Sequence, residues 1–143
     1  TDVRNFGAVV RSAEAMGAHG ILVPEKGSAQ VNGDAVKTSA GALLRLPICR
    51  VRFLKEAFQY LKDGGIQIVG ITEKANAPIS ELNFTLPTCL VLGSEEDGIS
   101  PEYLNQCDAS GIIPMPGGFD SLNVSVAAGM ALYEAARQRF EIG

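Results

Sequence analysis

The amino-acid sequence predicts an α/β fold, in which helices cover both faces of a parallel sheet. Apolar residues at helical spacing alternate along the chain with short runs that are rich in β-branched residues. Two of these runs, 66–71 and 88–92, carry no charge and are mostly apolar, which is typical of strands covered on both faces. The 143 residues are enough for one domain with a buried core.

The N-terminal part of the chain predicts two helices and two strands. The first helix is predicted by five apolar residues at helical spacing, with Asn5 as its N-cap: Phe6, Val9, Val10, Ala13 and Met16. Residues 20–24 predict a short buried strand, which ends at a proline. A shorter helix over 34–44 and a strand over 48–51 follow.

The rest of the chain continues the alternation. An amphipathic helix is predicted from Phe53 to Leu61, with two glycines behind it to end it. The remaining predicted strands are 66–71, 88–92 and 111–114, and the remaining helices are a short one over 100–107 and a long one over 123–140.

The composition limits the classes of protein that the chain can belong to. Hydrophobic residues make up 46% and charged residues 20%, and no apolar stretch is long enough to cross a membrane. The three cysteines are widely spaced, so we expect free, buried thiols of a cytoplasmic protein and no zinc site. The net charge of −4 does not by itself indicate a nucleic-acid partner.

Polar or glycine-rich loops follow three of the predicted strands. They cover residues 72–76, 93–98 and 115–123. Parallel α/β sheets bind their ligands beyond the carboxyl ends of the strands. We therefore expect the functional site where these three loops meet.

The loop at 93–98 is bracketed by glycines but has no phosphate-binding fingerprint. Its three acids, Glu95 to Asp97, would repel a pyrophosphate, whereas S-adenosylmethionine carries hydroxyls and a cation and meets no such repulsion. The same loop could instead be a solvated turn that caps a helix, or it could hold Mg²⁺.

Other polar residues also have a structural interpretation beside the functional one. Ser121 or Asn123 could be the N-cap of the last helix, and Arg11 could be an exposed arginine on the first helix. His19, the single histidine, falls in a predicted surface turn. No Ser-His or Cys-His nucleophile system is then available, which argues against a hydrolase.

Three stretches, in this order and spacing, resemble the three motifs of the SpoU/TrmH family of RNA 2′-O-ribose methyltransferases. They are residues 2–14, from Asp2 to Glu14; residues 92–99, Leu-Gly-Ser-Glu-Glu-Asp-Gly-Ile; and residues 113–127, which contain Ser-Leu-Asn-Val-Ser. Residues 39–42 with Leu46 and Pro47 also resemble the branch of the family that modifies ribosomal RNA.

The resemblance implies a fold, a reaction and partners. It implies a C-terminal deep trefoil knot of the SPOUT type, a homodimer, and methylation of a ribose 2′-hydroxyl in RNA, ribosomal RNA in the first place, by S-adenosyl-L-methionine without a metal. The alternatives are tRNA as the substrate, or a non-catalytic RNA-binding or assembly module on the same fold. We expect residues 1–143 to be a catalytic domain, a fragment that lacks the first strand and an N-terminal RNA-binding extension.

The resemblance also assigns roles to residues of this chain. The expected cofactor-binding residues are Thr72, Leu92, Gly93, Ile113, Met115 and Leu122, and the expected catalytic and substrate-positioning residues are Asn5, Arg11, Glu95, Ser121 and Asn123. Arg11 is the family's candidate base. A guanidinium has a pKa above about 12, so we expect Arg11 to orient the phosphate and the hydroxyl first, with proton abstraction as the alternative role.

Overall fold

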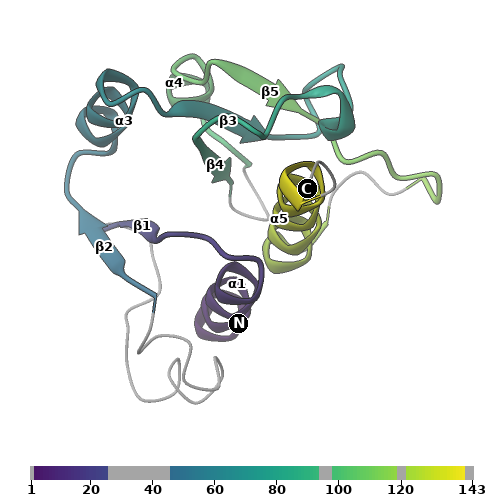
Figure 1. The fold of residues 1–143 in the computed structure, drawn as a ribbon, viewed down its shortest axis with the longest axis horizontal. Coiled ribbons are helices and arrows are strands. Elements are labelled where there is room, and N and C mark those ends of the chain that lie inside the picture. The colour runs from purple at the N-terminus through teal and green to yellow at the C-terminus, as the bar shows by residue number, and fades with distance from the viewer. Residues whose placement is uncertain (1, 26–45, 94–97, 119–121, 141–143) are drawn as a thin grey trace. The chain divides into compact units, whose positions relative to one another are not determined.

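The structure is a computed structural model that describes residues 2–25, 46–93, 98–118 and 122–140 (Figure 1). The chain divides into two compact units, Thr1–Leu54 and Lys55–Gly143. In each unit, the described residues combine helical structure, a single helix in the first unit, with parallel strands, so the predicted α/β class is confirmed.

The described residues of the first unit form one helix and a pair of strands. Helix α1 spans Asp2–Ala15, and strands β1 (Ile21–Pro24) and β2 (Ile48–Val51) pair in parallel. The prediction that Asn5 is the N-cap is wrong, because the helix already begins at Asp2. The predicted helix over 34–44 lies outside the described residues.

The second unit is built on a three-stranded parallel sheet of order β4-β3-β5, with β3 in the centre. The strands are β3 (Gln67–Ile71), β4 (Thr88–Leu92) and β5 (Ala109–Gly111). Its helices are α3 (Leu54–Asp63), the 3₁₀ helix η2 (Ile79–Glu81), α4 (Pro101–Leu104) and α5 (Val124–Phe140).

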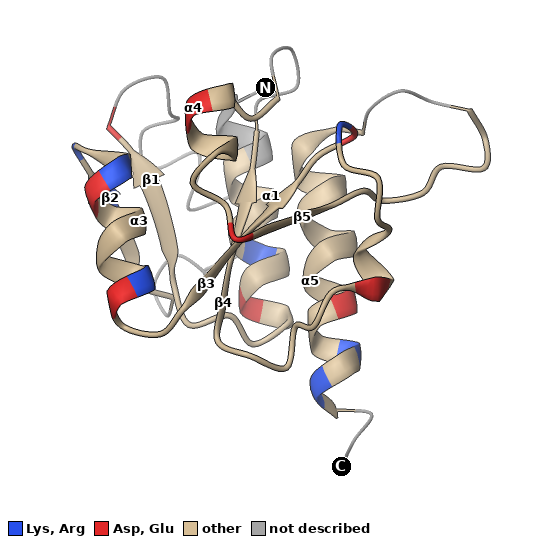
Figure 2. Ribbon diagram, turned by 90° about the horizontal axis from the view of Figure 1, so that it is seen from above, with Lys and Arg blue, Asp and Glu red and all other residues tan. Residues whose placement is uncertain are grey.

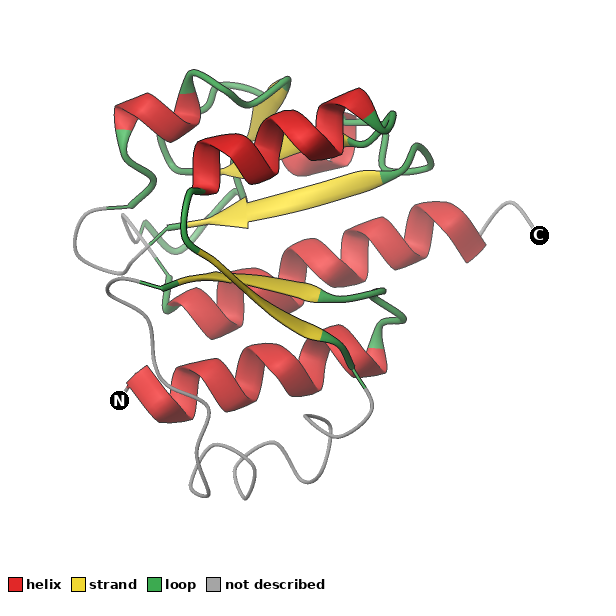
Figure 3. Cartoon of the chain, turned by 90° about the vertical axis from the view of Figure 1, so that its left-hand side faces the viewer, coloured by secondary structure: helices red, strands yellow, loops and turns green. Residues whose placement is uncertain are grey.

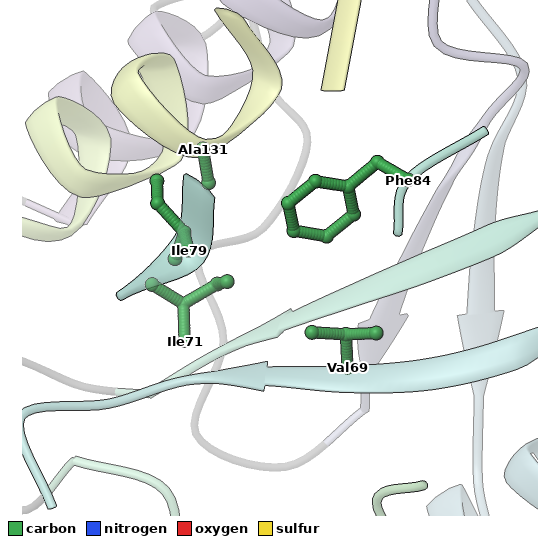
Figure 4. Close-up of a cluster of buried hydrophobic side chains, with 5 residues drawn as sticks. All are labelled: Val69, Ile71, Ile79, Phe84 and Ala131. Carbon is green, nitrogen blue, oxygen red and sulfur yellow. The ribbon is translucent and has the colours of Figure 1, made fainter. Parts of the chain in front are cut away.

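Alternate residues of β3 face opposite sides of this sheet. Val69 and Ile71 pack with Ile79, Phe84 and Ala131 of α5 in a hydrophobic cluster (Figure 4). Figures 1 and 3 show α3 and α5 on opposite sides of β3. Within this unit, helices therefore cover both faces of the sheet, as predicted.

The opposite face of β3 is covered by α3 and α4. A Cβ on Gly70 would lie 3.1 Å from the Cys107 sulfur and 3.3 Å from Leu104, so a larger residue would require these side chains to shift by a few tenths of an ångström. The rings of Phe58 on α3 and Tyr103 on α4 meet edge to face, with their centroids 6.1 Å apart.

Polar side chains near the end of α5 fasten this helix to the segment before β4. The Gln138 amide donates to the Leu82 carbonyl at 2.9 Å and accepts from the Phe84 amide at 2.8 Å. Glu134 is buried, and both its oxygens accept hydrogen bonds from Arg137, at 2.9 and 2.8 Å. The two Gln138 contacts anchor α5 over the hydrophobic cluster.

Two sequence predictions of secondary structure need correction. The last strand lies at Ala109–Gly111 and not at 111–114, and η2 was not predicted. Beyond Gly111 the backbone leaves β3: the Ile112 amide donates to the Ala77 carbonyl at 2.8 Å, and the Ile79 amide donates to the Ile112 carbonyl at 2.9 Å. This long-range pairing has no local sequence signal.

The cysteines are free thiols, but the prediction that all three are buried is wrong, because Cys49 is exposed on β2. Cys89 and Cys107 are partly buried. Among the described residues, no helix has both the length and the apolar character that a membrane span requires.

Candidate functional site

The three strands of the second unit end together, and this edge carries the candidate site. Ile71 is aligned with Leu92 on β4 and with Gly111 on β5. The residues that follow these strand ends start from neighbouring positions, where parallel sheets bind their ligands.

Thr72 connects the centre of this edge to β5. It is 7% exposed, and its amide donates to the Gly111 carbonyl at 2.9 Å. Its hydroxyl oxygen accepts a hydrogen bond from the Lys74 amide at 3.2 Å. The oxygen of this hydroxyl therefore accepts a hydrogen bond within the turn, and its hydrogen can donate to another group.

Gly93 begins the loop after β4 and lies against Gly98 and Ile99, at the other end of this loop. A Cβ on Gly93 would lie 2.1 Å from the carbonyl carbon of Gly98 and 2.3 Å from the amide nitrogen of Ile99. Gly98 itself has a φ of +67°, which favours glycine. The backbone at this edge therefore leaves no room for a side chain at position 93.

The segment after β5 turns back at the same edge. Ile113 and Leu92 both pack against the hydrophobic cluster of the second unit. Met115 starts a tight turn, in which the Gly118 amide donates to the Met115 carbonyl at 3.0 Å. Leu92, Gly93 and Ile113 are thus held in place by sheet register and core packing, and the cofactor role expected of them stays a prediction.

Asn123 caps α5, which is the structural interpretation of this residue. Its side-chain oxygen accepts from the Ser125 amide at 2.8 Å and from the Ser125 hydroxyl at 2.6 Å. Leu122, partly buried, directly precedes it. The catalytic role expected of Asn123 stays a prediction.

The remaining predicted catalytic residues lie elsewhere in the chain. Arg11 is exposed on α1, in the first unit, and no hydrogen bond or ion pair joins its guanidinium to another described residue. Asn5 lies on the same helix, but its side chain is outside the described part of the structure, as are Glu95 and Ser121.

Glu73 was not among the predicted site residues. It follows Thr72 at the end of β3, is exposed, and has a carboxylate oxygen 3.9 Å from the position that a Cβ would take on Gly98. The only sequence signal was an acid directly behind a buried strand.

The thiols of Cys89 and Cys107 are unsuited to nucleophilic chemistry at neutral pH. Burial, with a smaller contribution from Cys107, raises the pKa of Cys89 to about 11. Burial also raises the pKa of Cys107. A reactive cysteine needs a lowered pKa, so we assign both thiols to packing. Within the described ranges, no group of three or more His, Cys, Asp or Glu side chains is placed to hold a metal ion.

Charge is mixed on the helices beside the sheet. Figure 2 shows acidic and basic residues interleaved on α3. Lys55 pairs with Glu102 at 3.2 Å and Lys62 with Asp108 at 3.9 Å. Since each of these lysines already faces a carboxylate, α3 is a poor phosphate-binding surface.

The sequence matches the model of the SpoU rRNA Methylase family over residues 1–133. A protein of Mycobacterium sp. (strain KMS), named as an uncharacterized tRNA/rRNA methyltransferase, is 47% identical over 139 residues. The match covers 97% of this chain and 44% of that protein, so the chain spans less than half the length of this relative.

Two solved structures resemble this one closely. The SpoU methyltransferase AviRb from Streptomyces viridochromogenes, in complex with AdoMet, is 37% identical with a TM-score of 0.91, over 99% of this chain and 58% of that one. A structure described as an RNA 2′-O ribose methyltransferase is 34% identical with a TM-score of 0.86, over 97% of this chain and 53% of that one.

Proposed function

Because this chain belongs to the SpoU rRNA methylase family, we propose that it transfers a methyl group from S-adenosyl-L-methionine to a ribose 2′-hydroxyl of RNA. The AdoMet complex of AviRb supports the cofactor, and the similarity to an RNA 2′-O ribose methyltransferase supports the ribose as the acceptor. The family name favours ribosomal RNA; the mycobacterial relative's name leaves tRNA as the alternative. The proposal includes the cytoplasm as the place of the reaction.

One observation supports the cofactor site most strongly: the close approach of Gly93 to Gly98 and Ile99, at the edge where β3, β4 and β5 end. Because Gly93 has no side chain, the backbone of Gly98 and Ile99 packs against it, and backbone groups from both ends of this loop lie together at the sheet edge. In the proposal, the cofactor is held by Leu92, Gly93, Ile113, Met115 and Leu122, with the Thr72 hydroxyl as a donor. These partners suit an adenosyl ligand, which needs backbone hydrogen bonds and apolar contacts, and no metal is required.

When bound, S-adenosylmethionine supplies an electrophilic methyl group on a sulfonium. The chain must then hold the ribose hydroxyl in line with that methyl and accept or relay its proton. We assign the orientation of the hydroxyl and the adjacent phosphate to Arg11, whose guanidinium is exposed and unpaired among the described residues. Asn5, Glu95, Ser121 and Asn123 are proposed to brace the ribose and Arg11 by hydrogen bonds.

We further propose that the protein acts as a homodimer through α5. Val126, Met130 and Tyr133 follow one another at helical spacing and are 45%, 44% and 60% exposed. An apolar stripe of this kind is typical of an interface. The proposal also includes the family's C-terminal trefoil knot. Hydrogen bonds join Ile112 to Ala77 and Ile79, so the segment after β5 runs beside the loop after β3. This arrangement supports the knot.

Methyl transfer from labelled S-adenosylmethionine to ribosomal RNA and to tRNA tests the proposal. A methylated 2′-hydroxyl cannot take part in alkaline cleavage, so 2′-O-methylation leaves a labelled dinucleotide after hydrolysis, whereas a methylated base is released as a mononucleotide. We expect labelled dinucleotides from ribosomal RNA.

Label that is found only in mononucleotides would contradict the ribose as acceptor. Label found only in tRNA would indicate that tRNA, the alternative substrate, is methylated. Cofactor binding without any transfer to either RNA would favour the non-catalytic RNA-binding module.

A further inference from the structure

Glu73 occupies a central position at the proposed cofactor edge. It directly follows Thr72, at the end of the middle strand of the sheet. One of its carboxylate oxygens lies 3.9 Å from the position of a Cβ on Gly98, which closes the loop after β4. The side chain therefore extends from the end of β3 toward the end of that neighbouring loop.

The Glu73 carboxylate has no partner among the described residues, although most acids near this sheet have one. Asp63 accepts from Gln59, Glu102 and Asp108 pair with lysines, and Glu134 binds Arg137. Glu56 on α3 and Glu81 on η2 are also exposed without a partner, but they do not follow a strand. Glu73 is thus an unpaired carboxylate directly behind a strand end of the candidate site.

We propose that Glu73 is a cofactor-binding residue, whose carboxylate accepts hydrogen bonds from the ribose hydroxyls or the ammonium group of the adenosyl cofactor. The inference rests on the proposed function. The ribose hydroxyls and the ammonium group of the cofactor are hydrogen-bond donors, and each needs an acceptor on the protein. Among the described residues of the loops 72–76, 93–98 and 115–123, Glu73 carries the one carboxylate, and the Thr72 hydroxyl already accepts from Lys74.

The chemistry of the carboxylate also favours the cofactor over the RNA as its ligand. A carboxylate can accept from both hydroxyls of a ribose, and nucleotide-binding α/β sheets use an acid on a ribose hydroxyl in this way. Hydrogen bonds to a charged acceptor are about twice as strong as neutral ones. An RNA phosphate at the same place would be repelled.

Calorimetric titration of the whole chain with S-adenosylhomocysteine tests the assignment, with Glu73→Gln as the first variant. Gln keeps the size of the side chain but removes its charge and one acceptor. We expect affinity to fall about ten- to a hundredfold, as for the loss of a charged hydrogen bond. In methyl transfer, the KM for the cofactor should rise in proportion, while kcat at saturating cofactor should stay unchanged.

Asp63→Asn is the matched control. Asp63 is an exposed acid at the end of α3, just before the connection to β3. The substitution removes the same charge as Glu73→Gln and keeps the side-chain oxygen that accepts from Gln59. Affinity of this variant should equal that of the unmodified chain. Thermal unfolding of both variants verifies that they are folded.

A second ligand separates the two donor groups. 5′-Methylthioadenosine has the ribose but lacks the amino-acid part. If Glu73→Gln weakens both ligands equally, the carboxylate binds the ribose hydroxyls; if only S-adenosylhomocysteine is weakened, it binds the ammonium.

Affinities of Glu73→Gln within twofold of the unmodified chain, for both ligands, would overturn the inference and leave the proposed function intact. If the unmodified chain binds neither ligand, the cofactor proposal itself fails and the role of Glu73 fails with it.

Discussion

Gly93 and Gly98 are in backbone contact: a Cβ on Gly93 would lie 2.1 Å from the carbonyl carbon of Gly98. Real Cβ atoms do not approach other atoms this closely, and the opposing atoms belong to backbone that no side-chain rotation can move. The contact therefore brings the two described ends of the loop after β4 together at the candidate site.

Gly93→Ala should abolish binding of S-adenosylhomocysteine. The added methyl must push the backbone of Gly98 and Ile99 away, at a cost of about 3 kcal/mol in the free energy of unfolding, or distort the loop. Calorimetry and chemical denaturation measure the two effects. Gly64→Ala is the control, because a Cβ there would meet its nearest atom, a carbonyl oxygen, at 3.5 Å. Unchanged binding by Gly93→Ala would show that the ligand does not use this loop.

Arg11→Ala should lower methyl transfer at least about a hundredfold and leave the affinity for S-adenosylhomocysteine unchanged. The reason is that Arg11 lies on α1 of the first unit, whereas the proposed cofactor residues all belong to the second. Arg50→Ala removes another exposed arginine, on β2, and should retain activity. Transfer by Arg11→Ala within a few-fold of the unmodified chain would remove Arg11 from the mechanism.

Glu134→Gln should destabilise the fold by about 1–3 kcal/mol at pH 7, because Arg137 then loses a charged partner at a buried site. The hydrogen bond from Arg137, more than any other effect, lowers the pKa of Glu134 from its ordinary 4.5. A carboxyl group whose pKa is lowered in the folded state contributes its full stabilisation above about pH 4.5. This stabilisation is lost as the pH falls through the folded-state pKa.

The difference in stability between the original chain and Glu134→Gln should therefore shrink on acidification below pH 4.5. Urea denaturation at pH 7 and at lower pH measures it. Glu81→Gln, at an exposed position on η2, should change stability at neither pH. A difference that stays constant with pH would mean that the Glu134 charge does not contribute to stability.

Much of the fold could be predicted because local patterns determine it. The segments Ile48–Val51 and Thr88–Leu92 form strands with the predicted bounds. The third strand of the second unit was misplaced, because Asp108 and Ser110 interrupt its apolar pattern. Asp108 accepts a hydrogen bond from the Ile68 amide at 2.7 Å, a contact between residues 40 positions apart. No local pattern reveals such a partner.

The candidate site was predictable to the extent that strand ends determine it. Because Thr72 and Gly93 each directly follow a strand of the same parallel sheet, their positions at one edge follow from the rule for such sheets. The importance of Glu73 could not be predicted, since it depends on the approach of Gly98 from the neighbouring loop. Asn123 illustrates a further limit: the same residue type suits a helix cap and a substrate contact, and the cap is what the structure shows.

Tyr133→Glu should convert the protein from a dimer to a monomer. Tyr133 is 60% exposed on α5, on the same stripe as Val126 and Met130, while Ala131 on the opposite side of the helix is fully buried. Burying two symmetry-related carboxylates in an apolar interface without partners costs several kcal/mol, so the dimer dissociation constant should rise at least about a hundredfold. Light scattering at tens of micromolar protein measures the change. Tyr60→Glu, at an 80% exposed position on α3, should leave the dimer intact. If the unmodified chain is already a monomer at these concentrations, or if Tyr60→Glu dissociates the dimer and Tyr133→Glu does not, the α5 stripe is not the interface.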